Sequence, residues 1–213
     1  MSLSEEWSKL ELEITTCTKC KLHAFRRNPV PGEGNKQSLV VFVGEAPGEK
    51  EDETGRPFVG PAGKLLTELI ESMGFKREDF YITNVVKCRP PGNRDPEDDE
   101  VEACTPYLMR QLQLLRPKVI VTLGRHAGRV VFGVAGLRWT SVSANHGRVY
   151  SGRVWGLEVK IIPTYHPASA LYNPSVRKIL EADFKNVIKP VIEEALRGTT
   201  KKRYKTLFDF TSR

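Results

Sequence analysis

Four short apolar runs alternate with helical patterns along this chain of 213 residues. They lie at 38–43, at 80–86, at 118–123 and in the second half of a hairpin within 149–162, whose turn is predicted at residues 151–152. Runs of this length and composition are typical of strands that are buried on both faces. Strands that alternate with helices build a parallel sheet that helices cover on both faces. The sequence therefore predicts an α/β fold, a three-layer α/β/α sandwich around a four-stranded, mainly parallel sheet.

The segments between the strands have the spacing of amphipathic helices. One helix would begin at Pro61, because proline is favoured in the first helical turn. It places five apolar side chains on one face: Leu65, Leu66, Leu69, Ile70 and Met73. Further helices are predicted at 97–115, 125–132 and 174–196, and we expect Pro190 to kink the last one.

Composition indicates one domain with a preference for an anionic partner. Residues 1–197 are predicted to form that domain, and residues 198–213 a basic tail. The formal net charge of +7 and the isoelectric point of about 9.3 favour a polyanion such as nucleic acid, although many basic proteins bind none. No apolar stretch is long enough to span a membrane. The N-terminus lacks the apolar core of a signal peptide, so we expect a cytoplasmic protein.

The four cysteines of the chain fall into two pairs. Cys17 and Cys20 form a C-x2-C pair, and Cys88 and Cys104 form a C-x15-C pair. Four thiols match the ligand number of a tetrahedral metal or of an iron–sulfur cluster. Disulfides are disfavoured in an intracellular chain, and the tight first pair argues against unrelated buried cysteines. On spacing alone, structural zinc is favoured over an iron–sulfur cluster, but the spacing does not decide between them.

Polar residues follow each predicted strand, at the edge of a parallel sheet where ligands bind. They include Glu45, Asn84, His126 and His166. Each of these residues has an ordinary structural explanation when it is taken alone. A carboxylate, an amide and imidazoles that share one edge of the sheet together predict a binding or catalytic site.

Four longer motifs follow one another along the chain. They are GEAPG at 44–48, GRPFVGPAGKLL at 55–66, ITNVVKCRPPGNRDP at 82–96 and HPASAL at 166–171. The set resembles the uracil–DNA glycosylase superfamily, in particular the archaeal members of its iron–sulfur-containing family 4, over about residues 10–195. This resemblance implies that the cysteines bind a [4Fe–4S] cluster in place of zinc, with Cys17, Cys20, Cys88 and Cys104 as its ligands.

The resemblance also implies a function. The chain would be a monofunctional DNA glycosylase that flips uracil out of single- or double-stranded DNA and hydrolyses its N-glycosidic bond, which initiates base excision repair. Phe58 would stack on the base, and the Asn84 amide would accept a hydrogen bond from N3–H and donate one to O4. A neutral His166 would donate a hydrogen bond to O2 of the departing uracil.

The attacking water needs a carboxylate to position or polarise it. The resemblance assigns this role to Glu45, although Glu51 and Asp52 lie close enough in the sequence to share it. Other residues would hold the DNA, through main-chain amides, side-chain contacts to phosphate, and an apolar wedge at the vacated position in the base stack. The expected contacts are Gly44, Ala46 and Gly48 through the main chain, Ser169, Arg89 and Arg94 to phosphate, and Leu171 as the wedge.

Two other classes of function remain open from the residues alone. One is a non-catalytic iron–sulfur module that binds nucleic acid, and the other is a redox protein. The presence of Glu45, Asn84 and His166 together favours the enzyme. The residues do not indicate whether other bases are processed or how thymine is excluded.

The basic tail resembles a sliding-clamp-binding peptide. In such peptides an aliphatic residue is followed three residues later by an aromatic one, and Leu207 and Phe210 have this spacing. Tyr204 stands at the usual glutamine position, and Thr211 replaces a second aromatic residue. We expect a monomer that docks on a clamp through this tail.

Overall fold

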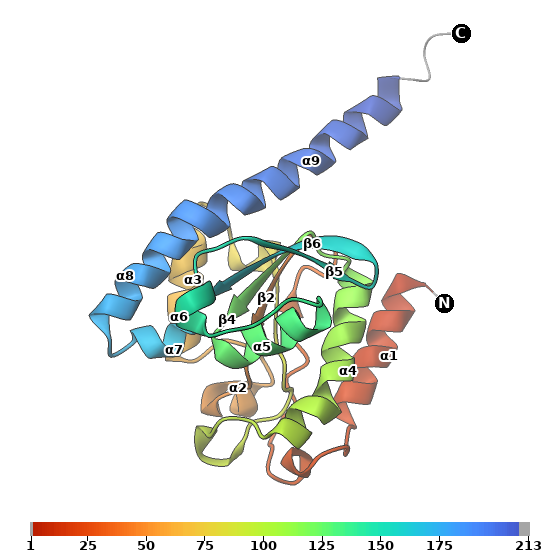
Figure 1. Cartoon of the computed structure of the whole chain (residues 1–213). Helices are drawn as coiled ribbons and strands as arrows, with labels where there is room; N and C mark the ends of the chain where they lie inside the picture. The colour runs from red at the N-terminus through yellow and green to blue at the C-terminus, as the bar shows by residue number, and fades with distance from the viewer. Residues whose placement is uncertain (1, 209–213) are drawn as a thin grey trace.

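A single twisted sheet runs through the centre of the protein in this computed structural model, which describes residues 2–208 and the side chains of residues 2–198. Its four central strands are parallel, in the order β3–β2–β4–β6 (Figure 1). These strands are β2 (Val40–Gly44), β3 (Tyr81–Asn84), β4 (Val119–Leu123) and β6 (Leu157–Thr164). Every residue of β2, β3 and β4 is buried, which explains why apolar residues follow one another in these runs instead of alternating with polar ones.

The predicted count of four strands was too low, because the described part of the chain contains six. β1 (Glu33–Gly34) pairs antiparallel with β3, and β5 (Tyr150–Val154) pairs antiparallel with β6. A two-residue strand such as β1 has no periodic pattern, so only its tertiary pairing identifies it.

The turn of the β5–β6 hairpin lies at Trp155 and Gly156, not at Ser151 and Gly152 as predicted. Trp155 and Gly156 have φ angles of 54° and 75°, which are the positive values of a two-residue hairpin turn. Ser151 and Gly152 pair within the ladder. A Cβ atom at Gly152 would lie 2.9 Å from the Cβ atom of Ala135, so this glycine allows close packing instead of a turn.

Helices cover both faces of the sheet and form the outer layers (Figure 1). One face is covered by α1 (Leu3–Thr15), α4 (Asp98–Leu115) and α5 (Arg125–Val134). The other is covered by α3 (Pro61–Ser72), α8 (Pro174–Asp183) and α9 (Lys189–Phe208). The three-layer α/β/α architecture is therefore confirmed. The sequence analysis missed α1, although Trp7, Leu10 and Ile14 are buried along one side of it.

The C-terminal helical region begins at Pro174 as predicted but differs from the prediction in its middle and at its end. α8 passes into a π-helical turn at Phe184–Ile188, just before Pro190. Proline lacks the N–H that a regular helix needs, so the helix is irregular near the residue where a kink was predicted. The predicted helix end at Leu196 was wrong, because α9 continues to Phe208 and projects from the body (Figure 1). The side chains of the expected clamp-binding residues Leu207 and Phe210 lie outside the described residues.

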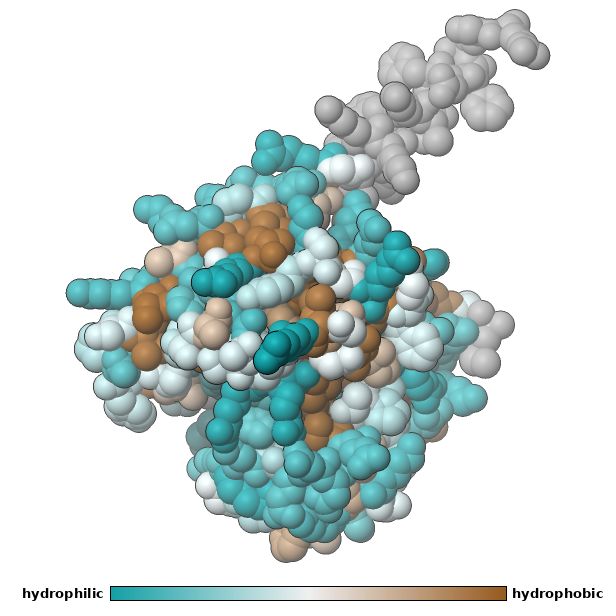
Figure 2. Space-filling model, viewed as in Figure 1, coloured by the Kyte–Doolittle hydropathy of each residue, from teal (hydrophilic) through white to brown (hydrophobic). Residues whose placement is uncertain are grey.

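Short helices complete the connections, as α2 (Glu49–Thr54), α6 (Val142–Asn145), α7 (Pro167–Ala170) and 3-10 turns at Lys21–Ala24, Arg77–Asp79 and Pro91–Asn93. Hydrophilic residues cover most of the face in Figure 2, between smaller apolar patches. Among the described helices, none combines the length and the apolar composition needed to cross a bilayer.

Candidate active site

The carboxyl ends of β2, β3 and β6 open onto one cavity of about 540 Å³. Nine of the residues that the sequence analysis selected line it: Glu45, Ala46, Gly48, Glu51, Phe58, Asn84, Arg94, His166 and Leu171. They come from segments up to 126 positions apart in the sequence, counted from Glu45 to Leu171. The tertiary structure therefore brings these residues together at the strand ends, as expected.

Gly44 lies close to two side chains of this cavity because it has no side chain of its own. It ends β2 and pairs in register with Asn84 at the end of β3. A Cβ atom at Gly44 would lie 2.4 Å from Asn84 Oδ1 and 2.5 Å from Phe58 Cζ. Any larger residue would displace one of these two side chains.

Phe58 is held rigidly in the wall of the cavity. Its φ angle of 51° lies in the left-handed region, which is uncommon for a bulky residue. Arg77 Nη1 donates a hydrogen bond of 3.1 Å to the main-chain oxygen of Phe58. The helix α3 comes so close that a Cβ atom at Gly63 would lie 1.9 Å from the same oxygen. The ring of Phe58 stacks at 5.6 Å from the ring of His166, so the two rings form one surface.

Glu51 and Asp52 are engaged with main-chain amides. Glu51 Oε1 accepts hydrogen bonds of 2.8 Å from the amides of both Val59 and Gly60. Asp52 is 3% exposed and accepts a hydrogen bond from the amide of Arg27. Glu51 therefore holds the loop that carries Phe58, and Asp52 holds the segment at Arg27. Of the three candidate carboxylates, Glu45 is the one without such a main-chain bond among the described residues.

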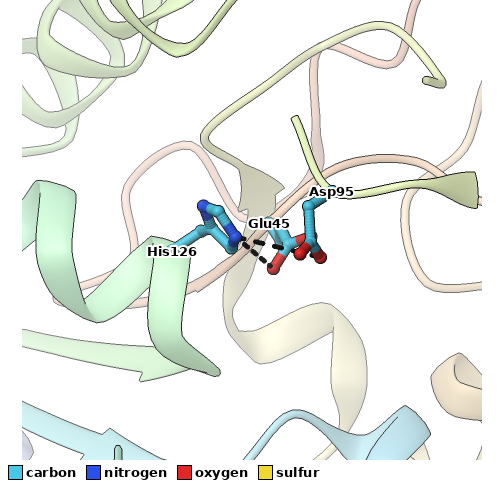
Figure 3. A group of neighbouring side chains, drawn as sticks. All are labelled: Glu45, Asp95 and His126. Atoms are coloured by element: carbon cyan, nitrogen blue, oxygen red, sulfur yellow. Dashed lines mark ion pairs between the residues drawn. The ribbon is translucent and has the colours of Figure 1, made fainter. Parts of the chain in front are cut away.

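Glu45 faces His126, which the sequence analysis placed at the strand ends without a role, and Asp95, which it did not assign to the site. Figure 3 shows Glu45, Asp95 and His126 pointing toward one another from the segment after β2, the loop before α4 and the start of α5. His126 Nε2 lies 3.8 Å from Glu45 Oε2 and 3.9 Å from Asp95 Oδ1. The ligand atoms of the three residues all lie within 4.8 Å of one another, a spacing that could hold a cation.

The electrostatics of this group favour a protonated Glu45 at lower pH. Burial, and to a smaller extent the neighbouring charge of Asp95, raise the pKa of Glu45 to about 7, while Arg125 opposes this shift. Burial lowers the pKa of His126, which favours the neutral imidazole. Neither ring nitrogen of His126 has a hydrogen-bond partner among the described residues. His126 was visible in the sequence only as a polar residue after a strand, and Asp95 only as part of the motif at 82–96.

Asn84 presents an unused acceptor to the cavity. The residue is 1% exposed, and its Oδ1 atom has no hydrogen-bond partner in the part of the chain that the structure describes. Buried polar atoms are nearly always paired, so an unpaired amide oxygen at a cavity wall indicates a place for a donor from a ligand.

His166 has a defined tautomer. The main-chain amide of Ala168 donates a hydrogen bond of 3.1 Å to Nδ1 of His166. Nδ1 is therefore the acceptor, and the neutral ring carries its proton on Nε2. Burial lowers the pKa of His166 to about 4. The imidazole is therefore a neutral hydrogen-bond donor at neutral pH.

The side chains of the other predicted DNA contacts are engaged with neighbouring groups of the protein. Ser169 is exposed, and its hydroxyl donates to the main-chain oxygen of His166 at 2.7 Å. Arg89 donates to the side chain of Asn93. Arg94 is bound to Glu100 through both of its terminal nitrogens, so this arginine is committed to an ion pair inside the protein.

The four cysteines line a second, small cavity between the segment after α1, the segment after β3 and the helix α4. None of them is in a disulfide, so that alternative does not describe this structure. Three N–H groups donate to sulfur: the Lys87 amide to Cys104 at 3.2 Å, the Arg26 guanidinium to Cys88 at 3.1 Å and the Lys19 amide to Cys17 at 3.4 Å. Such N–H···S bonds are typical of thiolates that bind metals or clusters.

Comparison with known proteins agrees with this geometry. Residues 31–191 match the family model of the uracil DNA glycosylase superfamily. The chain is 54% identical over 176 residues to the type-4 uracil-DNA glycosylase of Saccharolobus solfataricus, with 82% of each chain covered. It is 55% identical over 180 residues to that of Sulfurisphaera tokodaii, covering 84% of this chain and 82% of the relative. It is 55% identical over 175 residues to the type-4 uracil-DNA glycosylase of Archaeoglobus fulgidus, covering 82% of this chain and 88% of the relative.

Proposed function

The chain belongs to the uracil–DNA glycosylase superfamily and is a uracil–DNA glycosylase of base excision repair, and from this premise we propose that its 540 Å³ cavity receives a uracil that has left the base stack. The observation that carries this proposal is the convergence of Phe58, Asn84 and His166 on that one cavity. An aromatic face, a fixed amide and a neutral donor are the groups that a flipped uracil requires.

Phe58 and Asn84 select the base. The uracil ring stacks on Phe58, whose loop is held by Arg77 and Glu51. The unpaired Oδ1 atom of Asn84 accepts a hydrogen bond from N3–H of uracil, and the amide group donates to O4. Cytosine presents the reverse pattern, so it leaves these buried polar groups unpaired and is rejected.

His166 stabilises the leaving group. Negative charge develops on O2 of uracil as the glycosidic bond breaks, and the Nε2 proton of His166 is available to donate there. A preorganised donor of this kind is typically worth about 10²–10³ in rate. Because burial lowers the pKa of His166 to about 4, the ring is neutral at neutral pH and acts as a hydrogen-bond donor, not as an acid that transfers its proton.

Glu45 acts on the water that attacks the sugar. Its carboxylate can accept a proton from that water and can stabilise the positive charge on the sugar. A pKa near 7 suits a general base, which contributes about 10²–10⁴ in rate. With no lysine assigned as nucleophile, the proposed reaction is a monofunctional hydrolysis.

The cysteines are proposed to hold a [4Fe–4S] cluster. All four thiols line one cavity and three of them accept N–H···S bonds, which suits cluster ligation. When bound, the cluster supplies four iron–thiolate bonds that tie the segment after α1 to the loop after β3. Its role is structural, since the hydrolysis requires no electron transfer.

The remaining contacts are proposed for DNA binding. Main-chain amides of Gly44, Ala46 and Gly48 and the hydroxyl of Ser169 contact the DNA backbone, and Leu171 fills the vacated position in the stack. The substrate is single- or double-stranded DNA. The protein acts inside the cell as a monomer, and its tail docks on a sliding clamp through Leu207 and Phe210. Truncation after Arg203 then abolishes clamp pull-down but not excision from short DNA.

Excision from oligonucleotides with a single uracil, cytosine or thymine tests the proposal. We expect cleavage only of the uracil oligonucleotide, and at least a hundredfold loss in Asn84→Ala with DNA binding retained. Equal single-turnover rates in wild type and in the Glu45→Ala, Asn84→Ala and His166→Ala variants would refute the assigned roles. The non-catalytic alternative is already disfavoured by the relatives, which are named as glycosylases.

A further inference from the structure

A buried lysine lies directly behind the uracil-reading residue. Lys87 is 1% exposed and follows Asn84 by three positions. Its ammonium donates three hydrogen bonds: to Thr83 Oγ1 at 2.7 Å, to the main-chain oxygen of Asn84 at 2.5 Å and to Gln111 Oε1 at 2.7 Å. All three protons of the ammonium group are therefore used.

These three acceptors are neutral. Lys87 forms no ion pair with a carboxylate in residues 2–198, whose side chains the structure describes. Burial of an ammonium without an opposite charge is costly, and an apolar residue of similar shape would be the simpler solution for packing alone. The hydrogen-bond geometry therefore points to a role that packing does not explain.

The acceptors of Lys87 are themselves anchored. Gln111 donates from Nε2 to the main-chain oxygen of Pro31 at 2.8 Å, and the hydroxyl of Thr83 donates to the same oxygen at 2.7 Å. The ammonium thus closes a network between the end of β3, the helix α4 and the segment before β1. Within this network the only atom of Asn84 that Lys87 holds is its main-chain oxygen.

This main-chain bond matters because the side chain of Asn84 has an acceptor with no partner of its own. Oδ1 of Asn84 is unpaired in the described part of the chain, so no hydrogen bond to that oxygen fixes the amide before the base arrives. The direction of the side chain then depends on the peptide group from which it projects, and Lys87 fixes that group.

Lys87 also reaches the cysteine site. Its main-chain amide donates to Cys104 Sγ at 3.2 Å, and the next residue is Cys88. The same residue therefore contacts a cysteine ligand through its main chain and Asn84 through its side chain.

We propose that Lys87 is a positioning residue, which couples the cysteine site to the orientation of Asn84 and so to the recognition of uracil. The proposal rests on the function proposed for Asn84. It gives the cysteine site a specific effect on base selection in addition to stability.

A double-mutant cycle tests this coupling by single-turnover excision of uracil. Lys87→Met keeps the shape and removes the ammonium, and we expect a loss of about 10- to 100-fold, the worth of a hydrogen bond from a charged donor. In an Asn84→Ala background the same change should cost less than about twofold, because the residue through which Lys87 acts is gone. Equal losses in both backgrounds would show a merely structural role and overturn the proposal.

Binding gives a readout that does not depend on turnover. The probe is DNA with one 2′-fluoro-2′-deoxyuridine, which resists hydrolysis, compared with the same DNA carrying deoxycytidine. Lys87→Met should reduce the preference for the uracil probe by about the same 10- to 100-fold. An unchanged preference would overturn the proposal. Lys118→Met, which removes an exposed lysine that contacts Ala195, is the control and should leave the preference unchanged.

Folding of each variant is measured in parallel by thermal unfolding. The visible absorption of the proposed iron–sulfur cluster shows whether the cysteine site is intact. If Lys87→Met does not fold, Lys87→Gln replaces it in both experiments, because the shorter neutral side chain can still donate hydrogen bonds within the network. The outcomes that support or overturn the proposal are then the same as for Lys87→Met. The proposed function fails separately, if Asn84→Ala by itself excises uracil at the wild-type rate.

Discussion

The main-chain amide of Ala168 donates a hydrogen bond to Nδ1 of His166, at an N···N distance of 3.1 Å. This contact within the HPASAL motif determines which nitrogen of the imidazole carries the proton. It leaves Nε2–H as the donor and works together with burial, which lowers the pKa of His166 to about 4.

His166→Ala should therefore reduce single-turnover excision by about 10²–10³, the usual value of one lost oxyanion-type donor. Binding to uracil-containing DNA should change little, because the donor acts mainly on the charge that develops as the bond breaks. Stopped-flow or quench assays with excess enzyme measure the rate, and anisotropy measures the binding. A large loss of affinity with an unchanged rate would contradict the assignment.

The pH profile should report Glu45. A base must be ionised, and the pKa of Glu45 is raised to about 7, so the excision rate should fall about tenfold per pH unit below that value. Asp95→Asn removes a neighbouring negative charge, which makes ionisation of Glu45 easier and moves the midpoint to lower pH. Asp98→Asn is the matched control. It also removes a carboxylate, but one that is paired with Arg129, so the midpoint should stay in place. If the midpoint does not move in Asp95→Asn, Asp95 does not tune the base.

Gly44→Ala should abolish most activity in a folded protein. The added methyl group would lie 2.4 Å from Asn84 Oδ1 and 2.5 Å from Phe58 Cζ, so the base-reading surface must shift. Displacements of this size at a reacting geometry cost about a hundredfold. Gly133→Ala in α5 is the control, because a Cβ atom there meets nothing within 4 Å and alanine favours a helix. Excision and thermal unfolding of the two variants should separate the site effect from stability, and wild-type activity in Gly44→Ala would argue against the close fit.

Removal of a cysteine should weaken the fold before it changes the chemistry. Cys17→Ala should lose the visible absorption of an iron–sulfur cluster and lower the melting temperature, since the link between the segment after α1 and the loop after β3 is lost. Iron and sulfide analysis of the purified protein measures the occupancy. A variant without iron that keeps both the wild-type melting temperature and the wild-type rate would contradict the structural role.

Local sequence signals predicted the framework well. The buried strands β2 and β4 are apolar at nearly every position, and α3 carries its apolar residues on one face, so short segments of sequence are enough to predict them. The β5–β6 turn was misplaced because Trp155 adopts a positive φ that its residue type disfavours, whereas Gly152 offered a conventional turn signal and is used for packing instead. The two-residue strand β1 gave no local signal, because its pairing with β3 is a contact between distant segments.

The sequence by itself determined the class of fold, the residues at the strand ends and, through four ordered motifs, the family to which the chain belongs. Only the tertiary structure decided how those residues are tuned. It assigned Glu51 and Asp52 to main-chain amides, surrounded Glu45 with Asp95 and His126, and placed Lys87 behind Asn84. Hydrogen-bond partners, burial and pKa shifts arise between residues that are distant in the chain, so no local pattern of residues contains them.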